Sequence, residues 1–179
     1  DSGGDWGGGS YDSGGGSADY TATASVEGVG NVPAQEVSIT EGGTWSSDLE
    51  TYARQVVCSA MLALQGKLRY SMGSDRSQVW NGFTHGSGVG DCSSTISIIY
   101  KNCCGLNIGD WSGAIKGSST GITVDNNTGG IPDQSKLLPG DVICYNGHVE
   151  MYLGNDQCIG HGGPGIGPKM KTMSSYTDS

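Results

Sequence analysis

Basic residues are scarce in this chain, and its first 48 residues contain none. The sequence of 179 residues has nine Lys and Arg against 18 Asp and Glu, which gives a formal net charge of −9. Eight of the acids lie in residues 1–48, whereas the other ten share residues 49–179 with all nine bases, so this larger part is nearly neutral. Because no cluster of Lys or Arg is available to neutralise phosphates, we exclude nucleic acid as a partner.

Long apolar runs are also missing. No stretch approaches the roughly 18 apolar residues that a membrane-spanning helix needs, so we expect no membrane span. The N-terminus lacks a basic region followed by an apolar one, and no signal peptide is visible. The chain begins with Asp1 rather than Met, which we interpret as processing or excision.

Cysteine patterns typical of disulfide frameworks or zinc sites are absent. The six cysteines are irregularly spaced, with no paired Cys-x-x-Cys motifs, so we expect no metal and no cofactor. Four cysteines stand in apolar or alternating runs, where a thiol behaves as a small core residue: Cys58, Cys103, Cys144 and Cys158. Because Cys103 and Cys104 are adjacent, we expect one of the two to be exposed and oxidisable.

Composition divides the chain into three parts. Residues 1–18 consist mostly of Gly, Ser and Asp and predict a flexible linker, which implies a domain tethered upstream. Residues 19–45 predict a weakly structured lead-in that forms a strand or wraps the body. Residues 46–179 contain the periodic apolar segments of a folded domain.

Two helices are predicted in this domain. The Ser-x-x-Glu capping pattern at Ser47 precedes apolar residues at helical spacing and predicts a helix that ends near Gly66. A second helix is predicted after Asp91, with Asp91 or Ser93 as its cap and Gly105 as its end, although β-branched residues leave a strand as the alternative. Residues 71–91, between the helices, predict an extended loop.

Three short antiparallel strands are predicted near the C-terminus. Asn146-Gly147 separates residues 142–145 from residues 148–153 and is a strong hairpin signal. A turn at residues 154–156 leads into a third strand that ends at His161. Helices followed by antiparallel strands predict an α+β fold, with N-terminal helices packed on a small antiparallel sheet.

Cys92 is the cysteine best placed for chemistry. It stands where a loop enters a helix, and unpaired N–H groups and the helix dipole favour a thiolate there. His148 begins one predicted strand and His161 ends the next, so both imidazoles can lie at the same end of the sheet. This spacing is consistent with a Cys-His-His triad. A buried cysteine with two unconnected histidines is the alternative, and the strand register decides between them.

Four segments in this order resemble the NlpC-type cell-wall cysteine peptidases, papain-like bacterial and phage enzymes that cut peptidoglycan stem peptides. The resemblance covers about residues 48 to 165, and its four segments are Asp-Cys-Ser-Ser (91–94), Leu-Leu-Pro-Gly-Asp-Val (137–142), Gly-His-Val-Glu-Met-Tyr-Leu-Gly (147–154) and Ile-Gly-His (159–161). It implies a papain-like fold in which Cys92 is the nucleophile, His148 the base and His161 the residue that orients the base.

The resemblance also implies a substrate or oxyanion role for three further residues: Tyr70, Asp91 and Ser93. Helix capping is the alternative for Asp91 and Ser93. The sequence departs from the family where Ser94 and Thr95 replace a glycine and a larger residue. It departs again at Glu150, which we interpret as a solvated strand residue or a specificity contact.

The expected function is therefore peptidoglycan hydrolysis through an acyl-enzyme intermediate. By resemblance, the favoured bond joins D-γ-glutamate to the diamino acid of the stem peptide. N-acetylmuramoyl-L-alanine amidase or cross-bridge endopeptidase activity is the alternative within this class. A non-catalytic wall-binding or structural module of a phage tail or surface protein is the alternative from another class. Peptidoglycan is the expected partner, and the expected location is extracellular, at the cell wall or on a phage virion.

Overall fold

The computed structural model describes residues 19–24, 35–40, 47–126 and 130–175. The predicted linker at residues 1–18 lies outside these ranges. The α-helices are α1 (Ser47–Ala63), α2 (Asn81–Thr84), α3 (Cys92–Cys104) and α4 (Ser112–Lys116). Short 3₁₀ helices are η1 (Ser74–Trp80), η2 (Gln134–Lys136) and η3 (Met173–Ser175). The strands are β1 (Asp19–Ala24), β2 (Gln35–Thr40), β3 (Leu68–Tyr70), β4 (Gly88–Gly90), β5 (Val142–Tyr145), β6 (His148–Gly154), β7 (Gln157–Gly160), β8 (Ile166–Gly167) and β9 (Lys169–Thr172).

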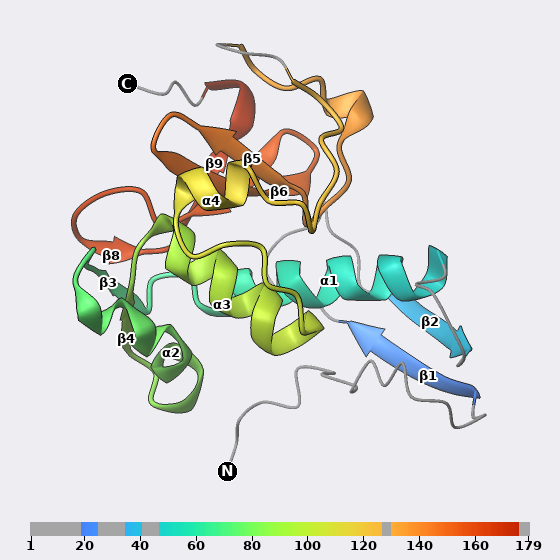
Figure 1. Ribbon diagram of the computed structural model, residues 1–179. Helices are drawn as coiled ribbons and strands as arrows, with labels where there is room; N and C mark the ends of the chain where they lie inside the picture. The colour runs from blue at the N-terminus through green and yellow to red at the C-terminus, as the bar shows by residue number, and fades with distance from the viewer. Residues whose placement is uncertain (1–18, 25–34, 41–46, 127–129, 176–179) are drawn as a thin grey trace.

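The main sheet contains four antiparallel strands in the order β5-β6-β7-β9 (Figure 1). Helices α1 and α3 pack against it, so the expected α+β architecture is confirmed. The predicted hairpin at Asn146-Gly147 is present and pairs Tyr145 with His148. The turn from β6 to β7 is also present, with Asn155 and Asp156 both at positive φ, which Asn and Asp tolerate better than most residues.

Successive side chains along β6 point to opposite faces of the sheet. Val149, Met151 and Leu153 are fully buried against α1 and α3 in the larger core. Tyr152, on the opposite face, belongs to a smaller cluster with Ile143, Cys158 and Met173. Each large apolar side chain buried in this way contributes about 1.5–3 kcal/mol, and together they hold the strands that carry the site.

Both predicted helices are confirmed. Gly66, at a φ of +73°, follows the turn that leaves α1. Asp91 caps the N-terminus of α3, and Gly105 ends this helix in the left-handed conformation, which glycine adopts at little cost. The 3.6-residue periodicity and the caps are local signals, and here they agree with the tertiary structure.

The prediction of an extended loop over residues 71–91 was wrong, because η1, α2 and β4 lie in this segment. β4 pairs in parallel with β3, and β3 pairs antiparallel with β8, forming a second small sheet. A fourth strand, β9, extends the main sheet beyond the three that were predicted. β3, β4 and β8 have only two or three residues each, so distant partners determine them and local propensity does not.

Within the predicted lead-in, β1 and β2 form an antiparallel pair, with Asp19 opposite Thr40. β2 lies beside α1 (Figure 1). No helix in the described part of the chain is long and apolar enough to cross a membrane.

Candidate active site

Cys92 is the first residue of α3, as predicted, and its side chain is nearly buried. The N-terminus of the helix is held by a capping box. The Asp91 carboxylate accepts a hydrogen bond from the Ser94 N–H at 2.8 Å, and the Asp91 N–H donates to Ser94 Oγ at 2.9 Å. The first N–H groups of a helix lack intrahelical acceptors and carry a partial positive charge. The sulfur therefore lies where negative charge is favoured.

His148 lies beside Cys92, a proximity that the spacing left open and the resemblance implied. It is the first residue of β6, and the Cys92 side chain is one of the two groups that raise the pKa of its imidazole. Burial by itself lowers the pKa of His148, but hydrogen bonds to Cys92 and Glu150, together with the negative charges on these groups, raise it to about 9. At neutral pH this imidazole therefore keeps its proton, next to the sulfur.

Glu150 is a site residue that the sequence interpretation missed. Its side chain is fully buried, which excludes the solvated role, and its Oε1 lies 2.8 Å from His148 Nε2. Lys171 on β9 donates a hydrogen bond to the same oxygen. A signal was present in the sequence: Glu150 is two residues after His148 on one strand, and such residues share a face of the sheet.

The structure does not bring His161 into contact with His148. His161 Nε2 donates to the Leu68 carbonyl at 2.7 Å, and its Nδ1 has no hydrogen-bond partner among the residues that the structure describes. Its ring stacks on Tyr70, with centroids 5.2 Å apart. Burial lowers the pKa of His161, so this buried imidazole favours its neutral form. Its assignment as the residue that orients His148 stays a prediction, and the contact which that role requires is made by Glu150.

Register explains the position of His161. Met151 pairs with Ile159, so Glu150 stands opposite Gly160, and continuing the same register places His148 opposite Gly162. His161 thus has the parity of Ile159, which packs on the helices. Neighbouring residues on a strand point to opposite faces of the sheet. His161 is the neighbour of Gly162, which stands opposite His148, so the two imidazoles point to opposite faces.

Tyr70 ends β3 close to the nucleophile. Burial raises the pKa of Tyr70, and negative charge on Cys92 and Asp91 raises it further. This coupling places the phenol within electrostatic reach of the Cys92 sulfur. Its expected role in binding the oxyanion or the substrate stays a prediction.

Asp91 and Ser93 are both buried and take part in holding the start of α3. Ser93 Oγ donates to Asp91 Oδ1 at 3.3 Å, and Arg76 approaches Asp91 Oδ2 at 3.5 Å. Capping is therefore observed for Asp91, and its proposed contact with the substrate stays a prediction, as does that of Ser93. The two departures from the family pattern serve the same end: Ser94 closes the capping box, and Thr95 Oγ1 donates to the Asp91 carbonyl at 2.7 Å.

The remaining five cysteines are free thiols. Burial raises the pKa of every one: to about 11 for Cys103, to about 12 for Cys58, Cys104 and Cys158, and by a smaller amount for Cys144. The expectation that Cys103 or Cys104 is exposed was wrong, because both are at most 5% exposed. Helix α3 contacts α1, α4 and the sheet, so neighbours cover more than one of its faces.

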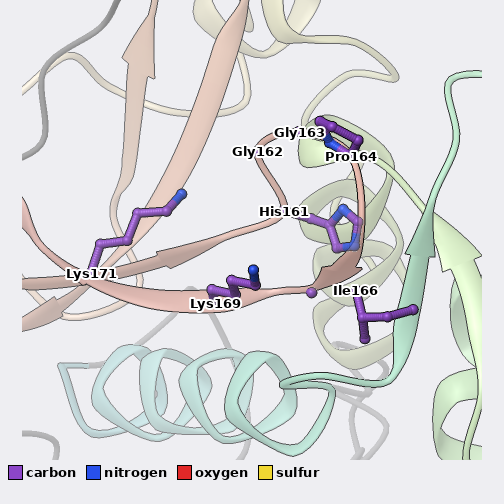
Figure 2. Close-up of a pocket in the computed structure, with 8 residues that line it drawn as sticks. His161, Gly162, Gly163, Pro164, Ile166, Lys169 and Lys171 are labelled. Atoms are coloured by element: carbon purple, nitrogen blue, oxygen red, sulfur yellow. The ribbon is translucent and has the colours of Figure 1, made fainter.

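A hollow lies beside the site, between the loop after β7 and strand β9. Figure 2 shows His161, Lys169 and Lys171 along it, with Gly162, Gly163 and Pro164 above His161 and Ile166 below it. Gly162 joins the hollow to the site, because a Cβ built there would stand 2.8 Å from His148 Cε1. Among the described residues, no group of His, Cys, Asp and Glu is arranged to hold a metal ion.

No curated protein matches the chain. Two similar solved structures are NlpC1 and NlpC2 from Trichomonas vaginalis, with identities of 19% and 16% and TM-scores of 0.46 and 0.49. The match with NlpC1 covers 70% of this chain and 39% of NlpC1, and the match with NlpC2 covers 89% of this chain and 70% of NlpC2.

A cysteine at the N-terminus of a helix, packed against a sheet that supplies the histidine, is the papain-like arrangement that the resemblance implied. The model of the NlpC/P60 family matches residues 66–177, more than half of the chain. Members of that family are generally cysteine peptidases that act on peptidoglycan. The chain belongs to the NlpC/P60 family.

Proposed function

We propose that this protein is a peptidoglycan hydrolase that cuts an amide bond of the stem peptide by covalent cysteine catalysis. The observation that carries this proposal is the placement of Cys92, at the N-terminus of α3, beside the imidazole of His148 on β6, whose pKa the Cys92 side chain raises. A thiol beside an imidazolium and the positive end of a helix is activated as a nucleophile.

In the first half of the reaction, the Cys92 thiolate, whose proton is held by the His148 imidazolium, attacks the carbonyl carbon of the amide. Backbone N–H groups at the start of α3 donate hydrogen bonds to the oxyanion of the tetrahedral intermediate. His148 then gives its proton to the leaving nitrogen. The C–N bond breaks, the amine departs, and the acyl group remains on Cys92 as a thioester.

In the second half, water attacks the thioester. His148, now neutral, takes a proton from this water, and the oxyanion again lies against the N–H groups of α3. The C–S bond breaks, the carboxylic acid is released, and Cys92 and His148 regain their starting protonation. No metal or cofactor takes part in these steps.

The favoured scissile bond joins D-γ-glutamate to the diamino acid, and family membership supports this choice. Cleavage between muramic acid and L-alanine, or of a cross-bridge, is the alternative bond. The hollow beside Gly162 extends the surface that the peptide would occupy. We place the activity at the bacterial cell wall or on a phage virion, because the substrate lies outside the cytoplasm, and we expect an upstream domain to direct it there.

The test is digestion of purified peptidoglycans of known stem and bridge chemistry, with mass spectrometry of the products. The wild type is compared with Cys92→Ala and with Cys144→Ala, a matched loss of a thiol outside the site. We expect new fragments from the wild type and Cys144→Ala and none from Cys92→Ala, and the fragment masses identify the bond. Cleavage by Cys92→Ala would contradict the mechanism. Sedimentation with the wall without cleavage by the folded, reduced wild type would favour a non-catalytic binding module.

A further inference from the structure

We propose that Glu150 is the positioning residue that holds His148 for catalysis, in the role which the sequence pattern assigns to His161. This inference rests on the proposed function, because it concerns the base of that reaction. It adds a residue from β6 itself to the pair formed by Cys92 and His148.

The first support is the contact between the imidazole and the carboxylate. Glu150 Oε1 lies 2.8 Å from His148 Nε2, a distance expected for a charge-assisted hydrogen bond. A carboxylate only accepts, so Nε2 carries the proton and donates. Each ring nitrogen makes one in-plane hydrogen bond, which leaves Nδ1 for the Cys92 sulfur. Glu150 therefore determines both the orientation of the ring and which nitrogen faces the nucleophile.

The second support is the space that Gly160 leaves for the carboxylate. Gly160 stands opposite Glu150 across the β6–β7 pair. A Cβ built at Gly160 would overlap Glu150 Oε2 and would stand 2.5 Å from Cδ and 2.9 Å from Oε1. The Glu150 side chain thus occupies the volume that a side chain at position 160 would fill. The acid on β6 and the glycine on β7 form one complementary pair.

The third support is the charge around Glu150. A fully buried carboxylate is costly unless it is paired and hydrogen-bonded. The Lys171 ammonium and the His148 imidazole both contact Oε1, so two cationic groups hold one oxygen of Glu150 in place. Within the described part of the chain, the other oxygen, Oε2, has no hydrogen-bond partner. This network keeps the carboxylate pointed at His148.

The fourth support is the position of His161, which does not contact His148. Its Nε2 donates to the Leu68 carbonyl, and its Nδ1 has no partner among the described residues, so neither nitrogen is bonded to His148. The register places it on the other face of β7 from Gly160. Glu150 is consequently the described side chain whose contact with Nε2 can orient the base.

The first experiment measures kcat and KM for peptidoglycan fragments across pH with Glu150→Gln. Glu50→Gln, an exposed acid on α1 that pairs with Arg54, is the matched control. We expect Glu150→Gln to lower kcat about 10- to 100-fold, the value of a lost charge-assisted hydrogen bond, with little change in KM. The alkaline limb of the kcat profile should move to lower pH, because the carboxylate no longer stabilises the imidazolium. Glu50→Gln should match the wild type.

An unchanged kcat profile in Glu150→Gln would overturn the inference, as would a shift of the alkaline limb in His161→Gln instead. If Glu150→Gln fails to fold, the double variant Glu150→Gln/Lys171→Met removes the uncompensated ammonium and is tested in its place. NMR titration of His148 in Cys92→Ala, with and without Glu150→Gln, needs no activity. We expect Glu150→Gln to lower the pKa of His148, and an unchanged pKa would overturn the inference even if the wild type cuts no peptidoglycan.

Discussion

Gly160→Ala tests the fit between Gly160 and Glu150 directly. The added methyl group would overlap Oε2 of Glu150 and stand 2.5 Å from its Cδ, and the three nearest heavy atoms all belong to Glu150. The carboxylate must therefore move, although the main chain need not. Moving it strains or breaks the 2.8 Å hydrogen bond to His148.

The magnitude follows from the groups involved. Inserting a methyl into a packed site costs about 1–3 kcal/mol, and straining the hydrogen bond costs only a part of the roughly 1.5–3 kcal/mol that a hydrogen bond to a charged group contributes. Replacing glycine by alanine at a compatible position recovers about 0.4–1 kcal/mol. We expect Gly160→Ala to lower the free energy of unfolding by about 1–3 kcal/mol.

The assay is urea unfolding of four proteins in a double-mutant cycle: the wild type, Gly160→Ala, Glu150→Ala and the double variant. In the Glu150→Ala background the obstructing atoms are absent, so Gly160→Ala should cost almost nothing, and the coupling energy should equal the about 1–3 kcal/mol estimated for the single change. Gly121→Ala is the control, because a Cβ there meets no atom within 4 Å. The reasoning is refuted if Gly160→Ala is as harmless as Gly121→Ala, or if the two changes at 150 and 160 are additive.

Two further predictions concern the titration and reactivity of the site. Because the pKa of His148 is raised to about 9, the imidazole keeps its proton below that pH and loses it above. We therefore expect kcat to fall as pH rises through about 9. A fall of kcat near pH 6.5, the ordinary pKa of histidine, would contradict the role of His148 as proton donor. Iodoacetamide at neutral pH should label Cys92 first in the native protein, because burial raises the pKa of each of the other five thiols. Peptide mass mapping of the wild type and Cys92→Ser checks this, and rapid labelling elsewhere would disprove it.

Local signals predicted the elements that carry the nucleophile and the base. The cap at Asp91 and the stop at Gly105 mark α3, and the Asn-Gly turn before His148 marks the β5–β6 hairpin. In these segments a few neighbouring residues determine the conformation. Strands β3, β4 and β8 escaped prediction because their two or three residues acquire their conformation from partners far away in the sequence.

Glu150 shows a different limit of prediction from sequence. Glu150 was considered as a solvated or specificity residue, yet it lies fully buried against His148 and Lys171. Its parity with His148 was readable from the sequence, because residues two apart on a strand share a face. The companion facts, that Gly160 stands opposite and that Lys171 on β9 reaches the carboxylate, depend on strand pairing.

The sequence alone determined which chemistry is available: a cysteine at a helix start, a histidine after a tight turn and a family pattern that joins them. The tertiary structure decided which side chain completes the pair. Strand register is a non-local property, and a difference of one residue exchanges the two faces of a sheet. Because Met151 pairs with Ile159, His161 points toward Leu68 and Gly160 stands opposite Glu150. The Glu150 carboxylate therefore has room to contact His148.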